Sequence, residues 1–184
     1  MFILDHTSWL LPLPRNVFTA IGLPLAVGML SGSRTKDVVK GTWYNSLYFP
    51  PGRAPGAIFP FAWTGLYIAM GYASHLAVRA YDRPFQMTSE LSLASVGIAL
   101  YYTQLGLNVL WTPLFFVRKQ TKLALVDSAL LTTLTIWMTK VLHEPTRGKS
   151  TWFLLPYCAW LSYATYLNAG IVYLNEGRSL PKDD

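Results

Sequence analysis

Charged side chains are scarce in this chain of 184 residues. Asp, Glu, Lys and Arg make up 13% of it, about half the fraction typical of soluble domains. Five long stretches hold at most one charge each, and a helix of about 20 mainly apolar residues crosses the hydrocarbon core of a bilayer. The sequence therefore predicts five transmembrane helices, near residues 16–33, 57–79, 91–117, 122–142 and 152–175.

Residues for common catalytic and metal sites are also missing. Cys158 is the one cysteine, so an internal disulfide is excluded. The three histidines, His6, His75 and His143, stand far apart without the paired spacing of a metal site. The chain has no G-x-S-x-G motif and no Walker loop, which argues against hydrolysis and phosphate chemistry. We predict no metal and no required cofactor.

The connections between the predicted helices leave no room for a soluble domain. No internal repeat or low-complexity segment interrupts them. We therefore expect a single all-α integral membrane domain over residues 1–184, a five-helix bundle with a loop over residues 34–56. The net charge of +6 is interpreted as anchors for anionic lipid headgroups, not as a nucleic-acid surface.

Five crossings would place the two termini on opposite sides of the membrane. Of the 15 Lys and Arg residues, nine fall on the C-terminal side and six on the N-terminal side. Because cytoplasmic loops carry the excess of basic residues, this distribution favours a cytosolic C-terminus.

Aromatic and polar side chains recur at helical spacing within three of the predicted helices. An amide in hydrocarbon costs several kcal/mol without a hydrogen-bond partner, so these faces are expected to turn inward. Together they would line an apolar pocket with a few polar groups, which suits a flat, largely hydrophobic ligand. The stripes follow one helix face and consist of Trp63, Tyr67, Met70 and Ser74; of Gln104, Asn108 and Trp111; and of Trp160, Ala164, Leu167 and Asn168.

Packing offers an alternative interpretation of the same residues. Asn and Gln often bond neighbouring helices, and Trp and Tyr often form belts at the membrane interface. Asp127, an acid inside the fourth predicted helix, is interpreted as structural. Residues near predicted helix ends are assigned to the belts, namely Trp9, Trp43, Trp152 and Tyr173.

A second stripe on the second predicted helix contains only small side chains. It consists of Gly65, Ala69, Ala73 and Ala77. Small residues at four-residue spacing let helix backbones approach closely. We expect this stripe to form a close contact, either within the bundle or between the protomers of a homodimer.

Four segments stand in order along the chain: WYNSLYFPPGRAPGAIFPFAWTGLYIAMGYAS, QLGLNVLWTPLFF, ALVD and PYCAWLSYATYLN. They resemble the translocator protein family (TspO, also called the peripheral benzodiazepine receptor), and the resemblance covers most of the chain from Gly22 to Asn175. It implies a five-helix bundle, often dimeric, that binds porphyrins such as protoporphyrin IX and haem. Eukaryotic members also bind sterols. For animal and fungal members it implies the mitochondrial outer membrane, with a cytosolic C-terminus.

Carried over by position, the family's pocket residues coincide with the three stripes. The porphyrin pocket predicted by the resemblance consists of Trp63, Tyr67, Asn108, Trp111, Trp160, Ala164, Leu167 and Asn168. The family's sterol motif is met by Leu167, Tyr173 and Arg178. That pattern is weak, and the alternative is that Tyr173 belongs to a belt and Arg178 anchors the surface.

The loop before the second helix departs from the family pattern. The family usually has Lys-Pro-x-Trp-x-Pro-Pro there, and this chain has FPPGRAP. Phe49 replaces the Lys, Gly52 the Trp and Ala54 the first Pro of the pair. The resemblance implies that this loop is a lid over the pocket, so the lost Trp removes a stacking surface of about 1 kcal/mol.

Three functions follow from these observations. The favoured one is a membrane protein that binds porphyrins or haem, and sterols as further candidates, for transport or as a receptor or sensor. The alternative is an enzyme that degrades porphyrin by photo-oxidation, which would depend on Trp63 and Trp160. A second alternative is a membrane scaffold that recruits partners through the small-residue stripe.

Overall fold

The computed structural model describes residues 8–33, 35–83, 88–179 and 181. The described residues form helices and connections without any strand. Five helices are long, and they are α2 (Val17–Gly32), α5 (Ile58–Tyr81), α6 (Thr88–Thr112), α7 (Thr121–His143) and α8 (Lys149–Leu174). The short elements are η1 (Ser8–Leu10), α1 (Pro12–Arg15), α3 (Thr35–Lys40), α4 (Thr42–Asn45) and the π-helix η2 (Pro113–Val117), which continues α6.

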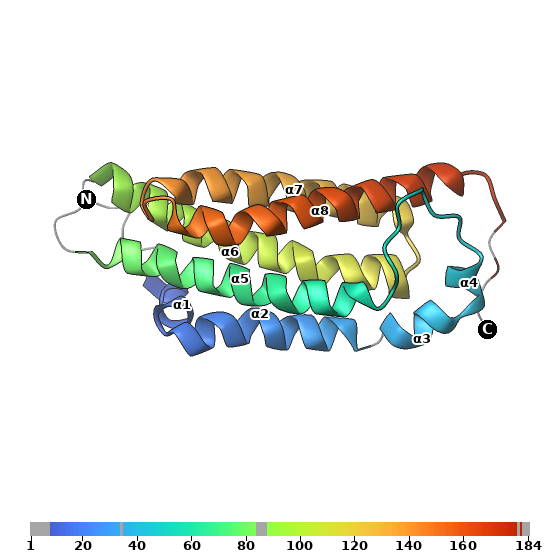
Figure 1. Ribbon diagram of the computed structural model, residues 1–184, viewed down its shortest axis with the longest axis horizontal. Coiled ribbons are helices and arrows are strands. Elements are labelled where there is room, and N and C mark those ends of the chain that lie inside the picture. Colours follow the sequence, from blue (N-terminus) through green and yellow to red (C-terminus); the bar gives the residue numbers. More distant parts are fainter. Residues whose placement is uncertain (1–7, 34, 84–87, 180, 182–184) are drawn as a thin grey trace.

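The long helices lie side by side and run in alternating directions (Figure 1). Helix α1, the end of α5 and the turn between α7 and α8 lie at one end of the bundle. Helices α3 and α4, the end of α6 and the end of α8 lie at the other end. Each long helix therefore extends along most of the bundle, and the connections gather at its two ends.

Three stretches among the described residues are long and apolar enough to cross a membrane. They are Val17–Lys40, Thr88–Val117 and Thr121–His143. Helices α5 and α8 have sufficient length, 24 and 26 residues, but their Trp, Tyr and Pro residues lower the mean hydropathy. These are the two helices that carry most of the candidate site, so the polar and aromatic stripes themselves weaken the hydropathy signal.

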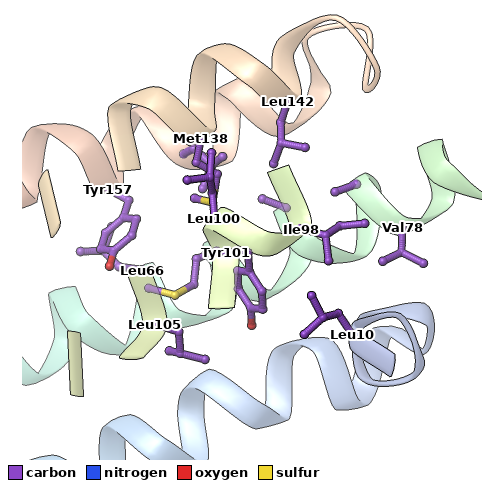
Figure 2. Packing of buried hydrophobic residues seen from close by; sticks show 14 of the residues in the cluster. Leu10, Leu66, Val78, Ile98, Leu100, Tyr101, Leu105, Met138, Leu142 and Tyr157 are labelled. Carbon is purple, nitrogen blue, oxygen red and sulfur yellow. The ribbon is translucent and has the colours of Figure 1, made fainter. Parts of the chain in front are cut away.

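The core lies between the long helices and is closely packed (Figure 2). Tyr101, Tyr157 and Met138 fill its centre and are almost completely buried. Helices α2 and α5 approach closely at Gly71, because a Cβ atom built there would lie 2.5 Å from the Ala20 carbonyl oxygen. At this position a side chain would push the two helices apart.

The connection between α2 and α5 differs from its prediction. The predicted loop over residues 34–56 contains the short helices α3 and α4. The belt assignment of Trp43 is also wrong, since its side chain is 3% exposed and packs edge-on against Phe115 at 5.8 Å. Helix α4 carries this ring and buries it in a cluster with Phe115 and Ile171. Trp9, Trp152 and Tyr173 are strongly exposed near the ends of the bundle, as expected of belt residues.

Candidate functional site

A chain of hydrogen bonds joins α5, α6 and α8 in the bundle interior. The Tyr67 hydroxyl donates to Asn108 Oδ1 at 2.9 Å, and Asn108 Nδ2 donates to the Tyr157 hydroxyl at 3.0 Å. The Tyr157 hydroxyl in turn donates to Gln104 Oε1 at 2.8 Å. Each buried amide therefore has a partner, which avoids the cost of an unsatisfied polar group away from water.

Aromatic rings cover this hydrogen-bonded chain. Trp63 stacks on Tyr67 with ring centres 5.5 Å apart and meets Tyr157 edge-on at 6.4 Å. Trp160 meets Phe59 edge-on at 5.5 Å. Because Trp63 and Phe59 belong to α5 and Trp160 and Tyr157 to α8, the two helices meet through rings. We call this group, Phe59, Trp63, Tyr67, Tyr157 and Trp160, the aromatic cluster.

The indole N–H of Trp160 has no hydrogen-bond partner within the part of the chain that the structure describes, although the nitrogen is buried. A buried donor without an acceptor costs free energy of about 1–3 kcal/mol. A ligand that brings a carboxylate or carbonyl oxygen to this nitrogen would recover that cost.

Trp111 and Asn168 form a second polar contact, toward the end of the bundle where α3 and α4 lie. The indole N–H of Trp111 donates to Asn168 Oδ1 at 3.0 Å, and Asn168 Nδ2 donates to the Thr121 carbonyl oxygen at 3.0 Å. These bonds join α6 and α8 to the start of α7. The polar groups of Trp111 and Asn168 are thus engaged in packing, while Leu167 is buried and Ala164 half-buried beside them on α8.

Two tyrosines of α8 hold the loop that precedes α5. The Tyr163 hydroxyl donates to the Gly52 carbonyl oxygen at 3.0 Å and accepts from the Ala54 N–H at 2.7 Å. The Tyr166 hydroxyl donates to the Pro51 carbonyl oxygen at 3.0 Å. Gly52 has a φ angle of +80°, which is strained for any residue with a side chain. The local backbone thus accounts for glycine where the family pattern has Trp.

The end of α8 holds the same loop through further contacts. Asn175 and Tyr48 exchange two hydrogen bonds, of 3.0 and 2.9 Å, between side chain and backbone. The Arg178 guanidinium lies 3.7 Å from the centre of the Tyr48 ring. Arg178 is therefore engaged with the loop, while Leu167 is buried and Tyr173 is 79% exposed. The three residues of the sterol motif do not share one face, and sterol binding stays a prediction.

The residues of the small-residue stripe on α5 differ in how deeply they are buried. Ala73 and Ala77 are each 1% exposed and belong to the core. Gly65 faces open space, since no atom lies within 4 Å of a Cβ built there. The inner half of the stripe packs within the bundle, so only Gly65 and the half-buried Ala69 remain for a contact with another chain.

The structure brings the predicted stripes together and adds residues that the sequence analysis missed. Tyr157 is completely buried and bonds to two residues of the stripe on α6, Asn108 and Gln104. Its position three residues before Trp160 continues the stripe on α8, and this spacing could have identified it. Tyr163 and Tyr166 were missed because their partners are backbone atoms of a loop. Within the described residues, no three His, Cys, Asp or Glu side chains are grouped to hold a metal ion.

Comparisons with known proteins agree with the resemblance in the sequence. The profile of the TspO/MBR family matches residues 20–174. The translocator protein homolog of Schizosaccharomyces pombe is 39% identical over 161 residues, which cover 88% of this chain and 93% of that protein. The translocator protein of Ovis aries is 37% identical, covering 74% and 76%. The tryptophan-rich protein TspO of Chlorobaculum tepidum is 33% identical, covering 84% and 92%.

Proposed function

Because the chain belongs to the TspO/MBR family of integral membrane proteins, we propose that it binds a tetrapyrrole, protoporphyrin IX or haem, at the aromatic cluster between α5 and α8. The observation that carries this proposal is the buried indole N–H of Trp160 in that cluster, which has no hydrogen-bond partner among the described residues. Rings supply stacking surfaces for a flat macrocycle. The indole N–H supplies a donor for an acidic side group at its edge.

Binding of so large a ligand requires the site to open. In the described conformation, Tyr67, Asn108 and Tyr157 bond to one another, and the loop from Tyr48 to Ala54 is tied to α8. We therefore propose that this loop acts as a lid and that ligand entry separates it from Tyr163 and Tyr166. The lid bonds to α8 through few hydrogen bonds, each worth about 1 kcal/mol, so this opening is accessible.

The remaining parts of the proposal concern the membrane and the assembly. We propose that all five long helices cross the bilayer, since they run the length of one bundle (Figure 1). A mitochondrial outer membrane with a cytosolic C-terminus remains the predicted location. Sterols remain candidate ligands, and a homodimer remains a candidate assembly through the outer part of α5 that contains Gly65.

A titration of the detergent-purified protein with protoporphyrin IX tests this function. We expect saturable quenching of tryptophan fluorescence with a Kd near micromolar, or about −8 kcal/mol. Trp160→Phe keeps a ring but loses the N–H, so binding should weaken by about 1 kcal/mol. Trp152→Phe is the matched control, because Trp152 is 77% exposed and does not belong to the aromatic cluster. Non-saturating quenching, or equal losses in the two variants, would contradict the proposal.

Illumination of the same mixture of protein and porphyrin distinguishes a binding protein from an enzyme. Illumination in oxygen should bleach the porphyrin no faster with the protein than with an unrelated membrane protein. If a photo-oxidised indole took part in chemistry, phenylalanine would not replace it, because its ring is much harder to oxidise. Rapid bleaching to a discrete product, lost in Trp160→Phe while binding persists, would favour porphyrin degradation.

A further inference from the structure

A groove between α7 and α8 lies outside the aromatic cluster. It has a volume of about 450 Å³, within the range of small-molecule sites. Its apolar part is formed by Ile136 of α7 and Leu155 of α8, whose side chains are 39% and 50% exposed. The groove is thus open on the outer side of the bundle, where a membrane protein meets lipid.

One end of the groove is polar. Lys140 and His143 of α7 line it together with Thr151 of α8, and His143 Nδ1 lies 2.9 Å from the Thr151 hydroxyl. Trp152, the next residue, is 77% exposed, as expected of a side chain at the membrane interface. The polar end therefore lies at the level of lipid headgroups, and the apolar end points toward the acyl chains.

The charges around this end favour an anion. Lys140 is exposed, and the turn between α7 and α8 adds the exposed cations Arg147 and Lys149. Glu144 is the one acid in that stretch from Lys140 to Thr151. Three permanent cations against one carboxylate leave a positive surface, and basic pockets between transmembrane helices attract anionic headgroups.

We propose that this groove binds an anionic phospholipid. Its phosphate would be held by Lys140, with donors from His143 and Thr151, and an acyl chain would lie along Ile136 and Leu155. The described residues that line the groove include no Trp, Tyr or Phe. A flat macrocycle would have no ring to stack on there, so this site is distinct in chemistry from the aromatic cluster.

Cys158 supplies a built-in reporter of the groove. It is the single cysteine of the chain, it lines the groove, and it is half-buried. A lipid in the groove would cover this thiol and hinder a reagent that approaches from the membrane. The wild-type protein can therefore be used without an introduced cysteine.

The test compares nanodiscs of phosphatidylcholine with nanodiscs that also contain phosphatidylglycerol. We expect phosphatidylglycerol to slow the reaction of Cys158 with N-ethylmaleimide several-fold, and native mass spectrometry to find phosphatidylglycerol retained on the released protein. Lys140→Gln should lose both effects. Lys36→Gln, which removes an exposed cation of α3 at the other end of the bundle, should keep both.

Three outcomes would overturn the proposal. The first is an equal rate of thiol modification in the two lipid compositions. The second is retention of phosphatidylglycerol by Lys140→Gln at the wild-type level. The third is protection of Cys158 that rises with protein concentration, since this would show that a second copy of the chain covers the groove.

Discussion

Asp127 is the residue whose environment is least favourable to its charge. It lies in the second turn of α7 and is 5% exposed. Neither carboxylate oxygen has a hydrogen-bond partner among the described residues. Burial of an unpaired charge is strongly unfavourable, and an acid within a membrane helix is usually a functional residue. The sequence favours a structural role for Asp127, yet the hydrogen bonds expected of a structural acid are missing from the described part of the chain.

Asp127→Asn should therefore raise the stability of the protein. The amide has the shape of the carboxylate but carries no charge, so we expect a gain of about 1 kcal/mol, since unpaired buried amides cost less than unpaired charges. Thermal unfolding in detergent, followed by tryptophan fluorescence, measures the change. Asp37→Asn on the exposed surface of α3 should have no effect. A loss of stability in Asp127→Asn would instead show that the carboxylate holds an ion or a lipid group.

The residue-level predictions succeeded where spacing alone decides the outcome. Helical periodicity places Tyr67 and Asn108 on inward faces, and they are hydrogen-bonded. Periodicity does not determine which partner an inward side chain meets, because this depends on the register between helices. The pairing of Trp111 with Asn168 could not be predicted for that reason, nor could the burial of Trp43 against Phe115.

At the scale of elements, the contact between α2 and α5 depends on Gly71. A Cβ at this position would lie 2.5 Å from the Ala20 carbonyl oxygen and 2.8 Å from the Ile21 Cα, and both are backbone atoms that cannot move alone. We expect Gly71→Ala to destabilise the bundle by about 2 kcal/mol through overpacking. Thermal unfolding in detergent tests this value.

Gly65→Ala is the matched control on the same helix. A Cβ at Gly65 meets no atom within 4 Å, and Ala favours helix over Gly by about 1 kcal/mol. This variant should be as stable as the wild type or slightly more stable. Equal melting temperatures for Gly71→Ala and Gly65→Ala would show that α2 and α5 do not approach closely at Gly71.

The long helices were predicted well because charges mark their ends. The uncharged stretch between Lys149 and Glu176 predicts residues 152–175, and α8 extends from Lys149 to Leu174. The short helices α3 and α4 were not predicted. With six and four residues, they are too short to show a period, and α4 is fixed by the packing of Trp43 on Phe115.

At the scale of the whole molecule, the arrangement of the helices bears on the number of crossings. Hydropathy alone supports three spans among the described residues, but α5 and α8 lie parallel to these spans over the length of the bundle (Figure 1). Arg15 also binds Asp82 through two hydrogen bonds of 2.8 Å, which holds the end of α5 beside α1. From this arrangement we predict that all five long helices cross the bilayer.

Side-specific labelling of single cysteines distinguishes five crossings from three. In a Cys158→Ser background, cysteine replaces Asp37 in α3, Glu144 after α7, or Ser179 after α8, all of them exposed. Sealed vesicles of one orientation are treated with an impermeant maleimide. With five crossings, Asp37→Cys and Ser179→Cys react from one side and Glu144→Cys from the other, because α7 ends and α8 begins at the opposite end of the bundle. If α5 and α8 did not cross, Glu144→Cys would react from the same side as Asp37→Cys, and that result would exclude the five-span arrangement.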